Sequence, residues 1–116
     1  MQPIATPTLS GISLAQEERL VLLIEEASEV IKEATKTLRF GFDSKNPLLE
    51  GARTNRENLE SEIGNFNNAV RMLVAADDLR ANRIKIAEDL KREVISYWVG
   101  KQPESKIGRA SCRERV

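Results

Sequence analysis

The chain has 116 residues, with 18 basic and 18 acidic side chains, a single cysteine and no histidine. This length fits one domain near the lower end of the sizes that bury a useful core alone, so oligomerisation would help it to fold. The lack of histidine excludes Ser/His/Asp triads, histidine general bases and nearly all zinc sites, and no apolar run approaches the ~20 residues of a membrane-spanning helix.

The first twelve residues predict an extended arm, because Pro3, Pro7 and Gly11 interrupt any helical pattern. They also lack the basic start and the continuous apolar stretch of a secretory signal. We therefore expect a cytoplasmic protein.

A long helix is predicted from Ser13, which forms a capping-box pattern with Gln16, to its end at Gly41. Apolar residues recur along it at steps of three and four, and this stripe comprises Leu20, Ile24, Ala27, Ile31, Ala34 and Leu38. Other apolar residues widen the apolar surface beyond one face, namely Val21, Leu22, Leu23 and Val30. The helix is therefore expected to be covered from more than one side, and a partner chain could supply the second cover.

Residues 42–53 predict a connection, since Pro47 and Gly51 interrupt them, and loops of this length tend to be functional or mobile. A capping-box pattern of Thr54 and Glu57 opens a second helix, which fades near residues 75–76. Its apolar stripe is Leu59, Ile63, Phe66, Val70 and Leu73.

A third helix is expected over residues 78–98, closed by Gly100 and Pro103. No strand pattern is present, so the sequence predicts an all-α domain over residues 13–106 with three main helices.

The last ten residues, 107–116, look like the in-frame translation of a common short-read sequencing adapter, and we expect them to be an artefact. They hold Cys112, so the rest of the chain has no cysteine for a disulfide or a thiol nucleophile. Without them the chain has 18 − 3 = 15 basic and 18 − 1 = 17 acidic residues, a net charge of −2. A mildly acidic chain is a poor candidate for binding nucleic acid.

Two polar pairs with the same spacing stand on the first two predicted helices: Glu26 with Glu29, and Glu62 with Asn65. Residues at i and i+3 share one helix face, so two such helices side by side can direct four oxygens at one point. Oxygen ligands of this kind suit Mg²⁺, which in phosphate chemistry is held by a few carboxylates and the phosphates of the substrate. The alternative is that these residues belong to ordinary solvated helix faces.

The segments LLIEEASEVIKEATKTLRFG and NRENLESEIGNFNNAVRML resemble the MazG-like family of all-α nucleoside triphosphate pyrophosphohydrolases. The family signature is E-x-x-E on one helix and E-x-x-D on the next; Glu26, Glu29 and Glu62 match it, and Asn65 stands in the place of the aspartate. The resemblance covers about half of the chain. It implies a helical bundle completed by homo-oligomerisation, as a homodimer or homotetramer.

The activity that the resemblance implies is cleavage of a nucleoside triphosphate between the α and β phosphates, which gives a monophosphate and pyrophosphate. Glu26, Glu29 and Glu62 would be the catalytic residues and, with Asn65, the Mg²⁺ ligands. Asn65 is an uncharged ligand or, alternatively, makes only a structural hydrogen bond in a degenerate site. Glu25 or Glu33 would accept a proton or bind a second ion, and the sequence does not choose between them.

Lys36 and Arg39 lie beyond Glu29 on a similar side of the first helix, where they could bind the triphosphate. Alternatively they are the basic residues that commonly end a helix. Phe40 and Trp98 are expected in the core rather than stacked on a base. The alternative to an enzyme is a non-catalytic helical module, either a nucleotide-binding relative without turnover or a protein-interaction domain.

Overall fold

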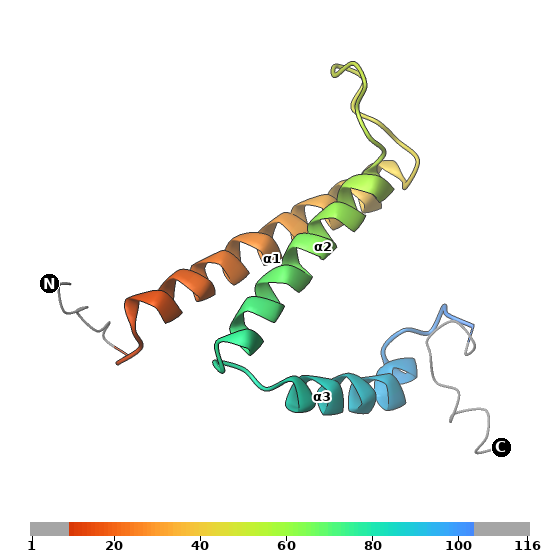
Figure 1. Ribbon diagram of the computed structural model, residues 1–116. Coiled ribbons are helices and arrows are strands. Elements are labelled where there is room, and N and C mark those ends of the chain that lie inside the picture. Colours follow the sequence, from red (N-terminus) through yellow and green to blue (C-terminus); the bar gives the residue numbers. More distant parts are fainter. Residues whose placement is uncertain (1–9, 104–116) are drawn as a thin grey trace, which may run out of the picture. The chain divides into compact units, whose positions relative to one another are not determined.

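The computed structural model describes residues 10–103, and within them it contains helices, turns and one isolated β-bridge (Figure 1). The elements in chain order are α1 (Leu14–Phe40), α2 (Asn55–Ala75), α3 (Ala81–Val94) and a 3-10 turn, η1 (Ile95–Tyr97). The expected all-α class is confirmed for this part of the chain. Most of the expected N-terminal arm and the whole of the tail 107–116 lie outside the described residues.

The chain divides into two compact units, Met1–Asp78 and Leu79–Val116. The first contains α1 and α2, and the second contains α3 and η1. The division falls inside the stretch 13–106 that was expected to form one helical domain.

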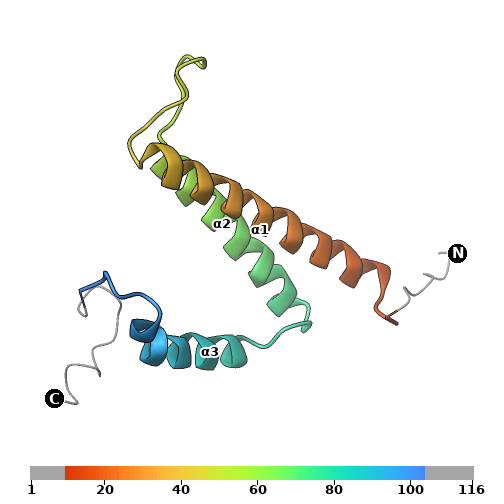
Figure 2. The same cartoon turned by 180° about the vertical axis from the view of Figure 1, so that it is seen from behind.

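In the first unit, α1 and α2 form an antiparallel hairpin and lie side by side (Figures 1 and 2). At the end where the loop joins them, the Asn55 side-chain amide donates a hydrogen bond of 2.9 Å to the Gly41 carbonyl. At the other end, Asp78 accepts hydrogen bonds from Arg19 Nε at 2.6 Å and from Gln16 Nε2 at 3.1 Å. Polar contacts therefore fix the register of the hairpin at both ends.

Both predicted capping boxes are confirmed. The Ser13 hydroxyl accepts from the Gln16 N–H at 3.1 Å, and the Gln16 side chain accepts from the Ser13 N–H at 2.8 Å. Thr54 and Glu57 make the same reciprocal pair at 3.1 and 2.9 Å. These bonds satisfy N–H groups that the first helical turn leaves without partners, so they fix where each helix begins.

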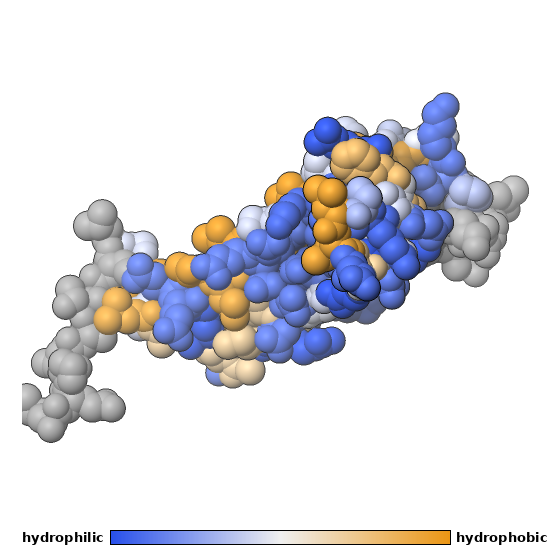
Figure 3. Space-filling model, turned by 90° about the horizontal axis from the view of Figure 1, so that it is seen from above, coloured by the Kyte–Doolittle hydropathy of each residue, from blue (hydrophilic) through white to orange (hydrophobic). Residues whose placement is uncertain are grey.

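The large residues of the predicted apolar stripe of α1 are exposed in the single chain, so the second cover that the sequence predicts for this helix stays a prediction. Ile24, Ile31 and Leu38 are 65%, 66% and 87% exposed. The reason is geometric: α2 covers only one face of α1, and the covered face is the one with Glu33 and Thr37. Figure 3 accordingly shows apolar side chains at the surface among hydrophilic ones.

The loop between α1 and α2 is closed by backbone hydrogen bonds. The N–H groups of Asn55 and Arg56 donate to the carbonyls of Ser44 and Phe42, both at 3.0 Å. Lys45 and Thr54 form an isolated antiparallel bridge, which holds the two arms of the loop together. The bridge does not extend into a β-strand within residues 10–103.

In the second unit, the third helix is shorter than the expected 78–98. The chain turns at Asp77, which has a φ of 63°, and α3 begins only at Ala81. Phe40 in the first unit and Trp98 in the second were expected in a core, but they are 60% and 74% exposed, because a single hairpin and a single helix offer no interior for them. No helix in the described ranges combines the length and the apolar character needed to cross a bilayer.

Candidate functional site

Two glutamates of α1 each bury one carboxylate oxygen. Glu33 is 7% exposed, and Oε2 of both Glu26 and Glu33 is buried without a hydrogen-bond partner among the described residues. The other oxygen of Glu33 accepts from Lys36 Nζ at 2.8 Å. A buried carboxylate oxygen without a partner is costly unless a cation or a donor compensates it. These two oxygens are therefore free to bind a positively charged ligand.

Glu29 lies on the same helix but is half-exposed. Its carboxylate makes a long ion pair of 3.9 Å with Lys32, and its side chain is 46% exposed. An exposed pair of this kind contributes little to stability, so it leaves Glu29 available to another cation. Glu25 is exposed, which makes Glu33 the more enclosed of the two glutamates between which the sequence did not choose.

On α2, the structure brings Glu62 and Asn65 together. Glu62 is half-buried, Asn65 is exposed, and the Asn65 side-chain amide donates a hydrogen bond of 3.4 Å to Glu62 Oε2. This contact matches the alternative that Asn65 makes a structural hydrogen bond. It also leaves the amide oxygen of Asn65 beside the Glu62 carboxylate, where it could serve as a ligand.

The register of the hairpin decides which residues of the two helices stand level. Because Gly41 and Asn55 meet at the loop end, Glu33 and Glu62 both lie about two helical turns from it. Glu29 and Asn65 lie about one turn further along, and Glu26 lies further still. Among the described residues, no three acidic side chains come close enough to form a ready-made metal site. The hairpin therefore aligns the predicted ligands without closing them around one point.

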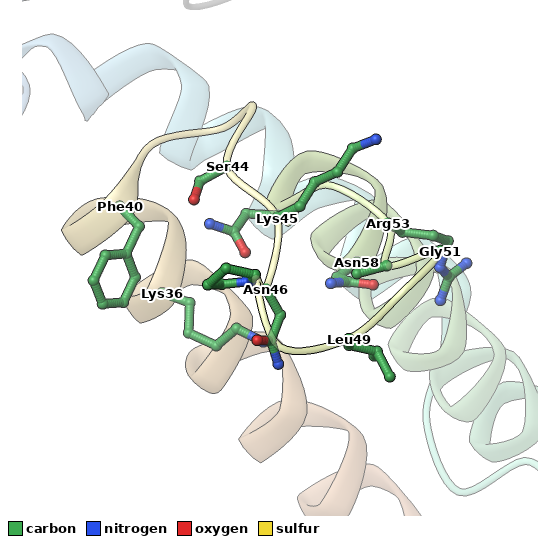
Figure 4. A pocket seen from close by; sticks show the side chains of 12 residues that line it. Lys36, Phe40, Ser44, Lys45, Asn46, Leu49, Gly51, Arg53 and Asn58 are labelled. Carbon is green, nitrogen blue, oxygen red and sulfur yellow. The ribbon is translucent and has the colours of Figure 1, made fainter.

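A cavity of about 890 Å³ opens at the loop end of the same hairpin (Figure 4). It is enclosed by the end of α1, the loop and the start of α2. Its basic and amide side chains are Lys36, Lys45, Arg53, Asn46, Asn55 and Asn58, and Phe40, Pro47 and Leu49 are among its apolar ones. Lys36 therefore borders both the cavity and the carboxylate of Glu33.

Arg39, the second basic residue predicted to bind substrate, does not line this cavity. Its guanidinium lies over the Phe40 ring, 5.1 Å from the ring centre. Sequence reasoning missed Lys45 and Arg53, although their place in a long loop interrupted by proline and glycine was an available signal.

Two carboxyl groups of the hairpin have depressed pKa values. Hydrogen bonds from the Thr54 N–H and hydroxyl lower the pKa of Glu57, and the charges of Lys45 and Arg53 lower it further. The hydrogen bond from Arg19, followed by that from Gln16, lowers the pKa of Asp78. Both groups are thus held as carboxylates that are bound to donors, unlike the Oε2 atoms of Glu26 and Glu33, which have no hydrogen-bond partner among the described residues.

No family model matches the chain, and no solved structure matches it. The chain is similar to the transcription elongation factor GreA of Chlorobaculum tepidum, with 25% identity over 120 residues that cover 94% of this chain and 76% of that protein. An identity of 25% does not establish membership of that family.

Proposed function

We propose that the protein is a Mg²⁺-dependent nucleoside triphosphate pyrophosphohydrolase that releases a nucleoside monophosphate and pyrophosphate. The observation that carries the proposal is the pair of buried carboxylate oxygens of Glu26 and Glu33, which have no partner among the described residues. Both glutamates lie on the same helix as Glu29. Glu33 is also at about the same distance from the loop end of the hairpin as Glu62 of α2. Next to Glu33 is a cavity with basic side chains, and Lys36 borders both.

The donor set fits a hard divalent cation. Glu26, Glu29 and Glu62 supply carboxylate oxygens and Asn65 supplies an amide oxygen, which are the ligand types that Mg²⁺ prefers. When bound, Mg²⁺ would neutralise phosphate charge and lower the pKa of a coordinated water. Of Glu25 and Glu33, Glu33 is the better candidate to accept a proton, because it is the more enclosed of the two and its Oε2 has no hydrogen-bond partner among the described residues.

Lys36 connects the two halves of the proposed site. It pairs with Glu33 at 2.8 Å and also lines the cavity, and its side chain is 40% exposed. A flexible ammonium in this place can exchange its carboxylate partner for a phosphate oxygen of the substrate. Arg39 remains a candidate for binding the outer part of the triphosphate, since its side chain is exposed near the same helix end.

The proposal includes assembly of at least two copies, as a homodimer or homotetramer, in the cytoplasm. Ala69 and Leu73 are the fully buried apolar residues of the described chain, whereas most large apolar side chains of α1 are exposed. A second copy that covers the stripe with Ile24, Ile31 and Leu38 would bury this surface.

A second candidate is a non-catalytic helical interaction module. It is favoured by the absence of a closed group of three carboxylates among the described residues and by the similarity to a transcription elongation factor. In that case the acidic face of the hairpin, formed by Glu26, Glu29, Glu33 and Glu62, would contact a partner protein, and Mg²⁺ would have no effect on the stability of the hairpin.

The proposal is tested by measuring pyrophosphate release from a panel of ribo- and deoxyribonucleoside triphosphates with Mg²⁺. We expect release from at least one of them, and a loss of more than about 100-fold in Glu29→Gln, which removes one charge at nearly constant shape and helix propensity. Glu60→Gln is the matched control, because Glu60 is exposed on α2 and takes no part in the site. Equal rates in wild type and Glu29→Gln would contradict the assignment.

A further inference from the structure

The loop end of the hairpin contains basic side chains that the proposed chemistry has not yet used. The cavity there is lined by Lys36, Lys45 and Arg53 and by no acidic side chain. Its volume of about 890 Å³ falls within the range of small-molecule sites. Such a cavity attracts an anion.

The charges of Lys45 and Arg53 are not neutralised by salt bridges within the described residues. Both charges act on the carboxylate of Glu57, which already accepts hydrogen bonds from Thr54. Figure 4 shows the two side chains on opposite arms of the loop. Both cations can therefore turn to a ligand.

The start of α2 cannot bind the anion itself. The N–H groups of Asn55 and Arg56 are taken by loop carbonyls, and that of Glu57 is taken by the Thr54 hydroxyl. These are the groups that bind phosphate at many helix N-termini. An anion in the cavity would thus be held by side chains, and the side-chain amide of Asn58, which makes no hydrogen bond among the described residues, is a further donor.

The loop that carries these cations is held by its own hydrogen bonds. Asn46 accepts at its carbonyl from the Leu49 N–H at 3.2 Å and at its side chain from the Leu48 N–H at 3.0 Å. The Ala52 N–H donates to the Leu49 carbonyl at 3.2 Å, and the bridge of Lys45 with Thr54 closes the base. A loop already folded in this way loses little conformational entropy when its cations bind a ligand.

Lys36 sets the direction of the ligand. It borders the cavity and lies 2.8 Å from Glu33, so the end of the ligand near Lys36 is also the end near the acidic face of the hairpin. A chain of phosphates can extend from there towards the loop cations.

We propose that this cavity is the oligophosphate pocket of the site, and that Lys45 and Arg53 bind the phosphate chain of a nucleoside polyphosphate together with Lys36. This inference rests on the proposed function for the identity of the ligand. The binding of the phosphate chain itself, however, depends on the cations of the pocket and does not require Mg²⁺.

The test is calorimetric titration with inorganic tripolyphosphate in the presence of EDTA and at low salt. We expect wild type to bind, the double variant Lys45→Gln/Arg53→Gln to bind at least about tenfold more weakly, and Lys45→Arg/Arg53→Lys to retain binding. The control is Arg71→Gln/Lys85→Gln, which removes the same charge from exposed positions outside the cavity. Far-UV circular dichroism and melting curves check that every variant is folded.

The pocket would be refuted if wild type does not bind tripolyphosphate, if the Lys45→Gln/Arg53→Gln variant binds as tightly as wild type, or if the control loses as much affinity. Its fate is separable from that of the proposed function. If tripolyphosphate binding needs Lys45 and Arg53 but no triphosphate releases pyrophosphate, the pocket is supported and the proposed enzymatic activity is refuted. If Lys45→Gln/Arg53→Gln releases pyrophosphate with an unchanged KM, the proposed enzymatic activity is supported and the phosphate-binding role of the pocket is refuted.

Discussion

Asn65 is the residue at which the enzymatic and structural interpretations differ most. Its side-chain amide donates to Glu62, and it occupies the position where the family that the chain resembles has aspartate. An amide contributes an oxygen to a metal site but no charge, so a site with Asn65 holds Mg²⁺ more weakly than one with a fourth carboxylate.

We expect Asn65→Asp to strengthen Mg²⁺ binding by roughly tenfold and to keep or raise pyrophosphate release, because the new carboxylate faces a cation. The measurement is a melting curve of wild type and variant with and without Mg²⁺, alongside the release assay. In a defunct site the same substitution would place an acid beside Glu62, and like charges would destabilise the hairpin. A variant that is less stable, inactive and insensitive to Mg²⁺ would count against the metal site on α2.

At the scale of the elements, what could be predicted from the sequence was local. The starts of α1 and α2 were predicted correctly, because a capping box involves residues three apart and depends on nothing else in the fold. Gly41 was placed correctly as the end of α1, where its φ of 93° favours glycine.

The choice of the face that α1 turns to α2 could not be predicted in this way. The apolar surface of α1 extends around much of the helix, so periodicity alone does not say which part meets the partner helix. In the structure α1 turns Glu33 towards α2 and leaves Ile31 exposed, and the bonds of Asn55 with Gly41 and of Asp78 with Arg19 accompany this arrangement. The cavity was likewise not predictable, because it depends on how the loop closes on itself.

The end of the hairpin away from the loop depends on the partly buried Asp78, and this gives the hairpin a pH dependence. The pKa of Asp78 is lowered in the folded state by the hydrogen bond from Arg19, so its contribution to stability is complete at pH values above the ordinary pKa of an aspartate, 3.8, which it has in the unfolded chain. The contribution is lost as the pH falls below that value and through the lower folded pKa.

We therefore expect wild type to lose stability below about pH 4 more steeply than Asp78→Asn, and the two to converge at low pH. At neutral pH the variant should be the less stable of the two. Urea unfolding as a function of pH measures both curves. Glu88→Gln on α3 is a control with an exposed carboxyl group that has no ion pair among the described residues. Parallel curves for wild type and Asp78→Asn would show that the pair has no energetic role.

At the scale of the whole molecule, the exposed apolar stripe of α1 is the strongest argument for assembly. A chain in which Ile24, Ile31 and Leu38 are each at least 65% exposed has more apolar surface than it can cover alone. A second copy packed on this stripe would complete the bundle that the sequence led us to expect.

If the folded form is a dimer, each tenfold dilution should lower its free energy of unfolding by about 1.4 kcal/mol. Ile31→Glu places a charge in the stripe, and we expect it to give a monomer of lower stability in sedimentation velocity and thermal melting. Glu18→Gln, an exposed substitution on the same helix, is the control. A wild-type monomer whose melting temperature is constant over a wide range of concentrations would contradict the assembly.

The central claim, cleavage between the α and β phosphates at the acidic face of the hairpin, is tested most directly by ³¹P NMR of a nucleoside triphosphate incubated with the protein and Mg²⁺. We predict that the triphosphate signals are replaced by those of monophosphate and pyrophosphate, and that Glu62→Gln or EDTA prevents this. Formation of diphosphate and orthophosphate, or unchanged triphosphate for every nucleotide tested, would contradict the claim.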